Sequence, residues 1–139
     1  MIRRRILLVE DNPDDESLTQ RALRRGDWGA EVSVAHDGAA ALEALNTMTE
    51  LPDLVLLDLK LPKLDGAEVL RQIRDNDRTR RLCVVVFTSS GEPRDIALCH
   101  GLGCNSYVVK PVAYESYVST VQQIGTYWLT LNETSLHQN

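Results

Sequence analysis

The sequence predicts an α/β fold in which five parallel strands alternate with five helices. Short aliphatic runs alternate five times with segments of helical spacing along a chain of 139 residues, which is enough for one domain of ordinary size. The central runs are continuously aliphatic, as expected for strands that helices cover on both faces. Such alternation gives a doubly wound parallel sheet with right-handed crossovers.

The first half of the chain supplies three strands and two helices. Residues 5–9 form an aliphatic strand that stops abruptly at acidic residues, and residues 14–25 place apolar side chains three and four apart before a glycine. Residues 31–35 are the second strand and residues 38–46 an alanine-rich helix. Residues 54–57 are the third strand, made only of Leu and Val.

The second half repeats the pattern. After a Leu-Pro loop, Asp-Gly opens a helix over residues 65–74, and residues 84–87 form the fourth strand. Residues 92–100 are helical and stop at a glycine, residues 107–109 are the fifth strand, and residues 112–131 form the last helix.

Composition excludes several classes of protein. Fifteen basic and 20 acidic residues give a net charge of −5, so the domain is a poor general binder of nucleic acid or anionic membrane. No uncharged apolar stretch reaches the roughly 18 residues of a membrane span, and the run at residues 6–9 is too short for a signal peptide. We therefore expect a cytoplasmic protein. Its three cysteines, with no C-x-x-C spacing, are expected to be buried free thiols.

The carboxyl ends of the predicted strands carry the candidate chemistry, since ligands of doubly wound sheets bind there. The strands end at Glu10 and Asp11, at Asp58, at Thr88 and at Lys110. Three carboxylates should therefore meet one hydroxyl and one ammonium. Two carboxylates about 4 Å apart repel by roughly 4 kcal/mol at an effective dielectric near 20. A cation must offset that repulsion, and Mg²⁺ suits the task because it binds carboxylate and phosphate oxygens.

This combination points to phosphoryl chemistry. A carboxylate beside Mg²⁺ and a lysine can attack phosphorus, and both cations neutralise the transferred oxygens. The Thr88 hydroxyl can rotate to donate to a phosphoryl oxygen. Each acidic residue alone would more often be a turn or N-cap residue, and Lys110 alone a solvated charge. It is their joint occurrence at successive strand ends that carries the interpretation.

Four segments resemble the receiver domain of two-component response regulators: Val-Glu-Asp-Asn at residues 9–12, Leu-Leu-Asp-Leu-Lys-Leu-Pro and Asp-Gly within residues 56–66, Thr-Ser-Ser at 88–90, and Tyr-Val-Val-Lys-Pro at 107–111. The similarity runs from about residue 6 to about residue 125. It implies a flavodoxin-like (βα)5 fold of strand order 2-1-3-4-5. Residues 1–131 would form a single receiver domain with an extended C-terminal helix, followed by a polar tail at 132–139.

The resemblance implies roles for the acidic residues. Asp58 would be the phosphoacceptor, phosphorylated by the phosphohistidine of a sensor histidine kinase or by a small acyl phosphate. Glu10, Asp11 and Asp58 would hold Mg²⁺ together with the backbone carbonyl of Lys60. Such a protein is a phosphoacceptor with only self-directed phosphoryl transfer and autodephosphorylation, and not an enzyme acting on other substrates.

It also implies a switch. Thr88 and Lys110 would bind the phosphoryl oxygens, and Tyr107 would swing inward when Thr88 moves, which changes the face made by the fourth helix, fifth strand and fifth helix. The bond between Lys110 and Pro111 is expected to be cis, as in such domains.

Three segments narrow the resemblance to stand-alone receivers that partner bacterial phytochrome histidine kinases: residues 88–90, 103–107 and 124–129. We expect no effector domain after it, and we expect the output to come from the receiver itself.

The last helix, about 30 Å long if it runs over residues 112–131, should overhang a sheet whose strands cover about 17 Å. Val118, Val121, Ile124, Trp128 and Leu131 share one stripe of it. Tyr127, Trp128 and Leu131 lie past the expected sheet edge, and we expect a homodimer through them.

Three other functions would use parts of the same pattern. An aspartate-nucleophile phosphatase that depends on Mg²⁺ needs an acid two residues after Asp58, where the chain has Lys60. A flavin-binding electron carrier needs a phosphate-cradling first loop, but residues 10–15 are acidic and would repel phosphate. A receiver-like interaction module that works without phosphorylation stays open.

Overall fold

The computed structural model describes residues 4–133 and contains one five-stranded parallel sheet with strand order β2-β1-β3-β4-β5. The elements are β1 (Arg5–Val9), α1 (Pro13–Arg24), β2 (Glu31–Ala35), α2 (Gly38–Thr47), β3 (Leu54–Leu57), α3 (Gly66–Asp75), β4 (Val84–Thr88), α4 (Pro93–Gly101), β5 (Ser106–Val109), α5 (Tyr114–Thr126) and the π-helical turn η1 (Tyr127–Leu131). The predicted fold and strand order are confirmed. Most of the predicted polar tail, residues 134–139, lies outside the described residues.

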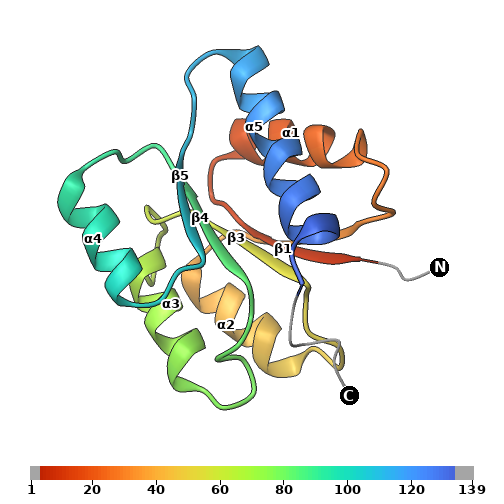
Figure 1. The fold of residues 1–139 in the computed structure, drawn as a ribbon. Coiled ribbons are helices and arrows are strands. Elements are labelled where there is room, and N and C mark those ends of the chain that lie inside the picture. Colours follow the sequence, from red (N-terminus) through yellow and green to blue (C-terminus); the bar gives the residue numbers. More distant parts are fainter. Residues whose placement is uncertain (1–3, 134–139) are drawn as a thin grey trace.

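Helices cover the sheet on both faces (Figure 1). Alternate residues of β1 point to opposite sides: Leu7 and Val9 join a core shared with α2, α3 and α4, while Ile6 and Leu8 join one shared with α1 and α5. Every residue of the central strand β3 is buried, because both of its faces lie under helices. This explains why that strand reads as an uninterrupted aliphatic run.

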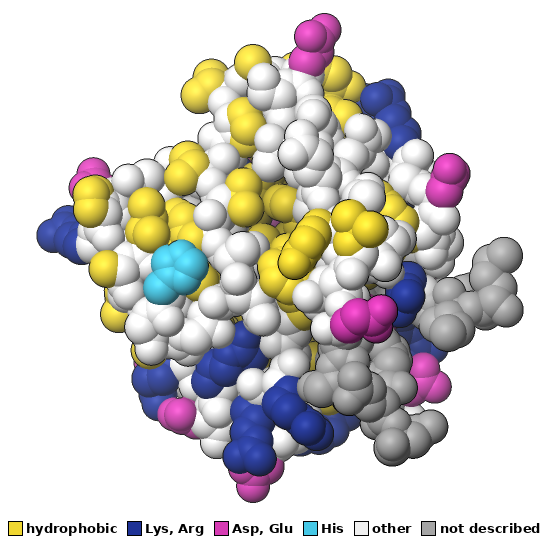
Figure 2. Space-filling model, in the orientation of Figure 1, with side chains coloured by type: hydrophobic (Ala, Val, Ile, Leu, Met, Phe, Trp, Pro, Cys, Tyr) yellow, Lys and Arg dark blue, Asp and Glu magenta, His cyan; other side chains and the backbone are white. Residues whose placement is uncertain are grey.

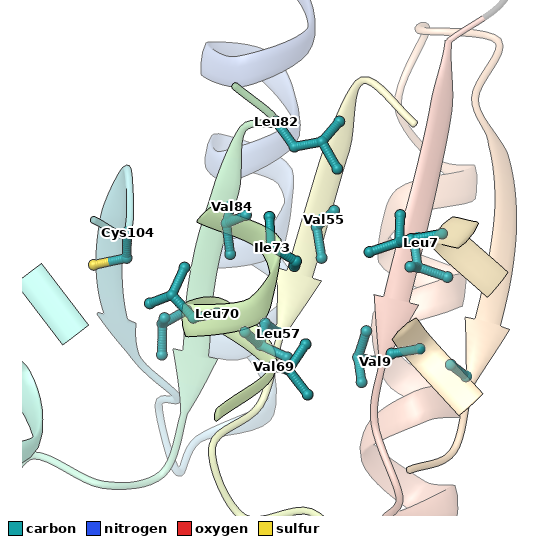
Figure 3. Packing of buried hydrophobic residues seen from close by; sticks show 14 of the residues in the cluster. Leu7, Val9, Val55, Leu57, Val69, Leu70, Ile73, Leu82, Val84 and Cys104 are labelled. Carbon is teal, nitrogen blue, oxygen red and sulfur yellow. The ribbon is translucent and has the colours of Figure 1, made fainter. Parts of the chain in front are cut away.

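The core on the α2–α3–α4 side is built from aliphatic layers. Figure 3 shows side chains of α3, among them Val69, Leu70 and Ile73, against Val55 and Leu57 of β3. A side chain of this kind contributes about 1.5–3 kcal/mol when it is fully buried. Cys83, Cys99 and Cys104 are buried free thiols, which confirms the prediction for them. Within residues 4–133 no helix is long and apolar enough to cross a membrane.

The C-terminal helix differs from its prediction. The regular part of α5 ends at Thr126, and residues 127–131 continue as η1, where the Asn132 N–H donates to the Tyr127 carbonyl five residues back. A π-helical turn shifts which residues face the core. Leu129, five residues after Ile124, is buried, whereas Leu131 is 67% exposed. The predicted stripe therefore packs on the core from Val118 to Trp128, and Leu131, predicted to lie past the sheet edge, is exposed.

A tryptophan explains two glycines on the α1–α5 side. The indole of Trp28 packs against Gly125 in α5 and against Gly26 at the end of α1, so closely that a Cβ at either glycine would overlap the ring. Gly125 thus gives α5 its close approach to Trp28, although glycine disfavours a helix interior by about 1 kcal/mol relative to alanine.

Replacing Gly125 with alanine should therefore destabilise the fold by about 1–3 kcal/mol, because overlap with the packed indole outweighs the gain in helix propensity. Urea denaturation followed by circular dichroism measures the change. Gly101→Ala at the end of α4 is the matched control, since a Cβ there meets open space. Equal stability of the two variants would show that Trp28 does not require the glycine.

Candidate functional site

Four strands deliver the predicted residues to one rim of the sheet. Glu10 follows β1, and its N–H donates to the Ala35 carbonyl (3.0 Å); Asp58 follows β3, and its N–H donates to the Val9 carbonyl (3.1 Å). Thr88 is the last residue of β4. Lys110 follows β5, where its N–H donates to the Thr88 carbonyl (2.7 Å). Parallel register thus brings distant parts of the sequence together.

The carboxylates of Glu10, Asp11 and Asp58 form one group, with one oxygen of each lying within 4.8 Å of the others. Glu10 and Asp58 are buried, whereas Asp11 is exposed. Backbone donors hold the two buried groups: the Asn12 N–H donates to Glu10 Oε2 (3.2 Å) and the Lys60 N–H to Asp58 Oδ1 (3.3 Å). Three close carboxylate oxygens are the donor set that a hard cation such as Mg²⁺ takes.

Lys110 is the cation at the centre of this group. Its buried ammonium donates to Glu10 Oε1 at 2.6 Å, to Asp15 Oδ2 at 2.8 Å and to Asp58 Oδ2 at 3.0 Å. The ammonium also lies 5.9 Å from the ring centroid of Phe87, within the range of a cation–π contact. One lysine therefore neutralises part of the charge of three acids.

The site shifts the pKa values of its two buried carboxyl groups in opposite directions. Burial raises the pKa of Glu10 to about 7 against the opposing effect of Lys110. Burial also acts on Asp58, but there the charge of Lys110, helped by hydrogen bonds, outweighs it and holds the pKa below its usual value. Burial lowers the pKa of Lys110, yet the hydrogen bonds to Asp15 and Glu10 outweigh it and the pKa is raised. Asp58 is thus ionised at neutral pH, whereas Glu10 gains and loses its proton near neutrality.

Thr88 and Tyr107 lie next to this group. The Thr88 hydroxyl is fully buried and near enough to favour the charged form of Asp58, but among the described residues it makes no hydrogen bond of normal geometry. The half-buried Tyr107 donates from its hydroxyl to the Ser90 carbonyl at 2.7 Å. Ser90 in turn donates to Asp95 in the first turn of α4 at 2.6 Å. The loop after β4 thus links Thr88 to both Tyr107 and α4.

A glycine shapes the loop that carries Asp58. Gly66, the first residue of α3, packs against the Asp58 carbonyl and Leu59 so closely that a Cβ would overlap them. The Gly66 N–H donates to the Leu59 carbonyl (2.9 Å), and the Asp65 side chain caps the helix at the Glu68 N–H (3.0 Å). The Asp-Gly pair of the sequence therefore fixes the start of α3 against the Asp58 backbone.

Two expectations about the site need revision. The bond between Lys110 and Pro111 is trans, as are the other peptide bonds in the part of the chain that the structure describes; the cis prediction is wrong, and trans is the form that an X-Pro bond intrinsically prefers. Asp15 was not among the predicted site residues, because it lies in the first turn of α1 and not at a strand end. Its signal was the acidic first turn of that helix.

Comparison with known proteins decides the family. Residues 6–122 match the response regulator receiver domain family. The chain belongs to this receiver family. It is 41% identical over 133 residues to the probable methanogenesis regulatory protein FilR2 of Methanothrix harundinacea, covering 93% of this chain and 86% of that one. Response regulator Rcp1 of Synechocystis is 38% identical over 129 residues, covering 89% and 88%.

Solved structures of receivers agree with this assignment. The phosphorylated cyanobacterial phytochrome response regulator RcpA superposes with a TM-score of 0.93 at 34% identity, covering 96% of this chain and 99% of that one. The Mn²⁺-bound form of Rcp1 superposes with a TM-score of 0.89 at 35% identity, covering 94% and 98%. The receiver described here is thus a two-component response regulator similar to phytochrome response regulators.

Proposed function

We propose that this receiver accepts a phosphoryl group on Asp58 from the phosphohistidine of a sensor histidine kinase. The carrying observation is the state of Asp58: a buried carboxylate whose pKa is held low, 3.0 Å from the Lys110 ammonium and grouped with Glu10 and Asp11. In the reaction an Asp58 oxygen forms a bond to phosphorus while the bond from phosphorus to the imidazole nitrogen breaks. The imidazole leaves with the electron pair and takes its proton from solvent.

The residues around Asp58 suit this transfer. Glu10, Asp11 and Asp58, with the Lys60 carbonyl, would hold Mg²⁺, which would supply positive charge to the phosphoryl oxygens. Lys110, at the end of β5, supplies a second positive charge, and its hydrogen bond orients the Asp58 carboxylate. The Thr88 hydroxyl, buried and free of a regular partner among the described residues, is ready to donate to a phosphoryl oxygen.

Intact-mass measurement after incubation with acetyl phosphate and Mg²⁺ tests this proposal. Wild type should gain the mass of one phosphoryl group as an acid-stable, base-labile adduct, and Asp58→Asn should gain none because it lacks the nucleophilic oxygen. Asp77→Asn, at a side chain 98% exposed, is the control that should label like wild type. Labelling of the Asp58→Asn protein to the wild-type extent would reject Asp58 as the acceptor.

Phosphorylation would be read out on the α4–β5–α5 face. The phosphoryl group adds about −1.5 to −2 charges and would attract the Thr88 hydroxyl as a hydrogen-bond donor. The loop after β4 connects Thr88 to Tyr107 and to α4, so a movement of Thr88 would reach both. Hydrophobic side chains gather on this face between α4 and α5 (Figure 2). Leu98 of α4, Val109 of β5 and Tyr114 of α5 are exposed hydrophobic residues of these elements. An apolar surface of this kind suits a protein partner.

The kinase would be a phytochrome, as the likeness to the cyanobacterial phytochrome response regulator RcpA supports. The receiver and its kinase would meet in the cytoplasm. A phosphatase and an interaction module that works without phosphorylation fit the site less well. A phosphatase would need an acid where Lys60 lies, and that side chain is an exposed cation. If the protein were an interaction module independent of phosphorylation, the buried Lys110 and its three carboxylate partners would have no function in it.

We further propose that two copies associate through the C-terminal region. Tyr127 and Leu131 are 48% and 67% exposed, and Tyr127 packs edge-on against Trp128 at 4.8 Å between ring centroids. Trp128 itself is half buried against the α1–α5 core, so it contributes less free surface than predicted. The exposed aromatic and aliphatic groups are the kind that form the centre of protein interfaces.

A double substitution of Tyr127 and Leu131 by aspartate should convert the dimer to monomer, since it places two charges in the contact. Sedimentation velocity over a wide concentration range, with and without acetyl phosphate, measures the effect. Val112→Asp is the control, because Val112 is fully exposed but lies outside this region. A wild type that stays monomeric under all these conditions would reject the dimer.

A further inference from the structure

Asp15 contacts the phosphorylation site from a helix, whereas the other residues of the site lie at the ends of strands. It lies in the first turn of α1, where its half-buried carboxylate accepts from Lys110 Nζ at 2.8 Å. The helix N-terminus favours a negative charge at this position. Asp15 does not belong to the group of three carboxylates that can share a cation, which comprises Glu10, Asp11 and Asp58.

Lys110 divides its hydrogen bonds between Asp15 and two carboxylates of the cation-binding group. An ammonium has three N–H donors, and here all three are used, on Glu10, Asp15 and Asp58. Two of these acceptors are also the buried members of the cation-binding group, so Lys110 and a divalent ion would share the same two carboxylates and compete for their negative charge. Asp15 is the acceptor of the three that lies outside this competition.

The position of Asp15 is fixed by its surroundings. The Asn12 side chain caps α1 and accepts from the Asp15 N–H at 3.0 Å. On the other side, the buried hydroxyls of Thr19 in α1 and Tyr117 in α5 lie 2.8 Å apart, and the Tyr117 hydroxyl donates a longer bond to the Asp15 carbonyl at 3.5 Å. These hydrogen bonds connect the first turn of α1 to α5, and they fix the backbone from which the Asp15 carboxylate extends.

We infer that Asp15 is a positioning residue that anchors the Lys110 ammonium and so keeps the oxygens of Glu10 and Asp58 available to Mg²⁺. The inference rests on the proposed function and adds to it how Lys110 and the metal share one cluster. Without Asp15, the ammonium settles on Glu10 and Asp58 alone and competes more strongly with the ion. One negative charge is lost from the site at the same time.

Titration calorimetry with Mg²⁺ measures the consequence. Asp15→Asn should weaken Mg²⁺ binding about fivefold, which corresponds to ~1 kcal/mol and to the upper range for a partly exposed ion pair. Asp15→Glu should restore most of the affinity, since it returns a charged carboxylate to the ammonium, whereas the asparagine oxygen is only a neutral acceptor. Asp14→Asn removes the same charge from an exposed neighbour and should change the affinity much less. Circular dichroism checks that each variant folds.

A double-mutant cycle separates anchoring from simple loss of charge. In a Lys110→Met background, Asp15→Asn should affect Mg²⁺ binding no more than Asp14→Asn does, because there is no ammonium left to anchor. A fivefold loss that persists without Lys110, or an Asp15→Asn protein that binds like wild type, overturns the inference alone. A wild type that takes up no Mg²⁺ overturns the proposed function and this inference with it.

Discussion

Replacing Lys110 with methionine should lower the free energy of unfolding by about 3–5 kcal/mol at pH 8 in the presence of a chelator. The ammonium is buried and forms ion pairs with Glu10, Asp15 and Asp58. Its removal leaves two buried carboxylates facing each other without a cation, and that is far more costly than the loss of an exposed ion pair. Urea denaturation at several Mg²⁺ concentrations measures the change.

Mg²⁺ should stabilise the Lys110→Met protein more than wild type, because the ion replaces the missing positive charge and has no ammonium to displace. Lys63→Met is the matched control: that lysine is 72% exposed and lies 3.6 Å from Asp37, so its loss should cost at most about 1 kcal/mol. A Lys110→Met protein as stable as the Lys63→Met protein in chelator would contradict the electrostatic account of the site.

The fold could be read from the sequence because each strand was marked by residue type and spacing. Continuous apolar runs at residues 54–57 and 84–87 identified strands covered on both faces, and glycine and proline marked the loops between elements. The end of α5 could not be read in this way. The change to a π-helical turn replaces a spacing of three or four by a spacing of five, so the structure buries Leu129, which the stripe drawn for a regular helix leaves out.

The site was predictable to the extent that it lies at strand ends. The parallel sheet dictates that Glu10, Asp58 and Lys110 meet, and the structure brings them within hydrogen-bond distance. Asp15 belongs to a helix instead, and three consecutive acids in that first turn gave no indication of which one faces the rim. Packing of α1 against α5 decides this, through contacts such as that between Thr19 and Tyr117, which are 98 residues apart in the chain.

Glu10 should make the stability of the metal-free protein fall as the pH rises from about 4.5 to about 7. Burial raises the pKa of Glu10 from 4.5 to about 7 in the folded protein, so between these values the folded state binds a proton that the unfolded state has lost. This contribution is fully present below pH 4.5 and is lost as the pH rises through the folded pKa. From the pKa difference it amounts to about 3 kcal/mol.

Glu10→Gln should remove that contribution, because glutamine keeps the shape of the protonated acid and does not titrate. In chelator its free energy of unfolding should therefore exceed that of wild type at pH 8 and approach it near pH 5, as measured by urea denaturation across this range. Saturating Mg²⁺ should narrow or reverse the difference at pH 8, since the ion binds the charged carboxylate of wild type and gains less from the amide. Stability curves for the two proteins that stay parallel from pH 5 to pH 8 would show that Glu10 is ionised throughout, with Lys110 and the backbone outweighing the effect of burial.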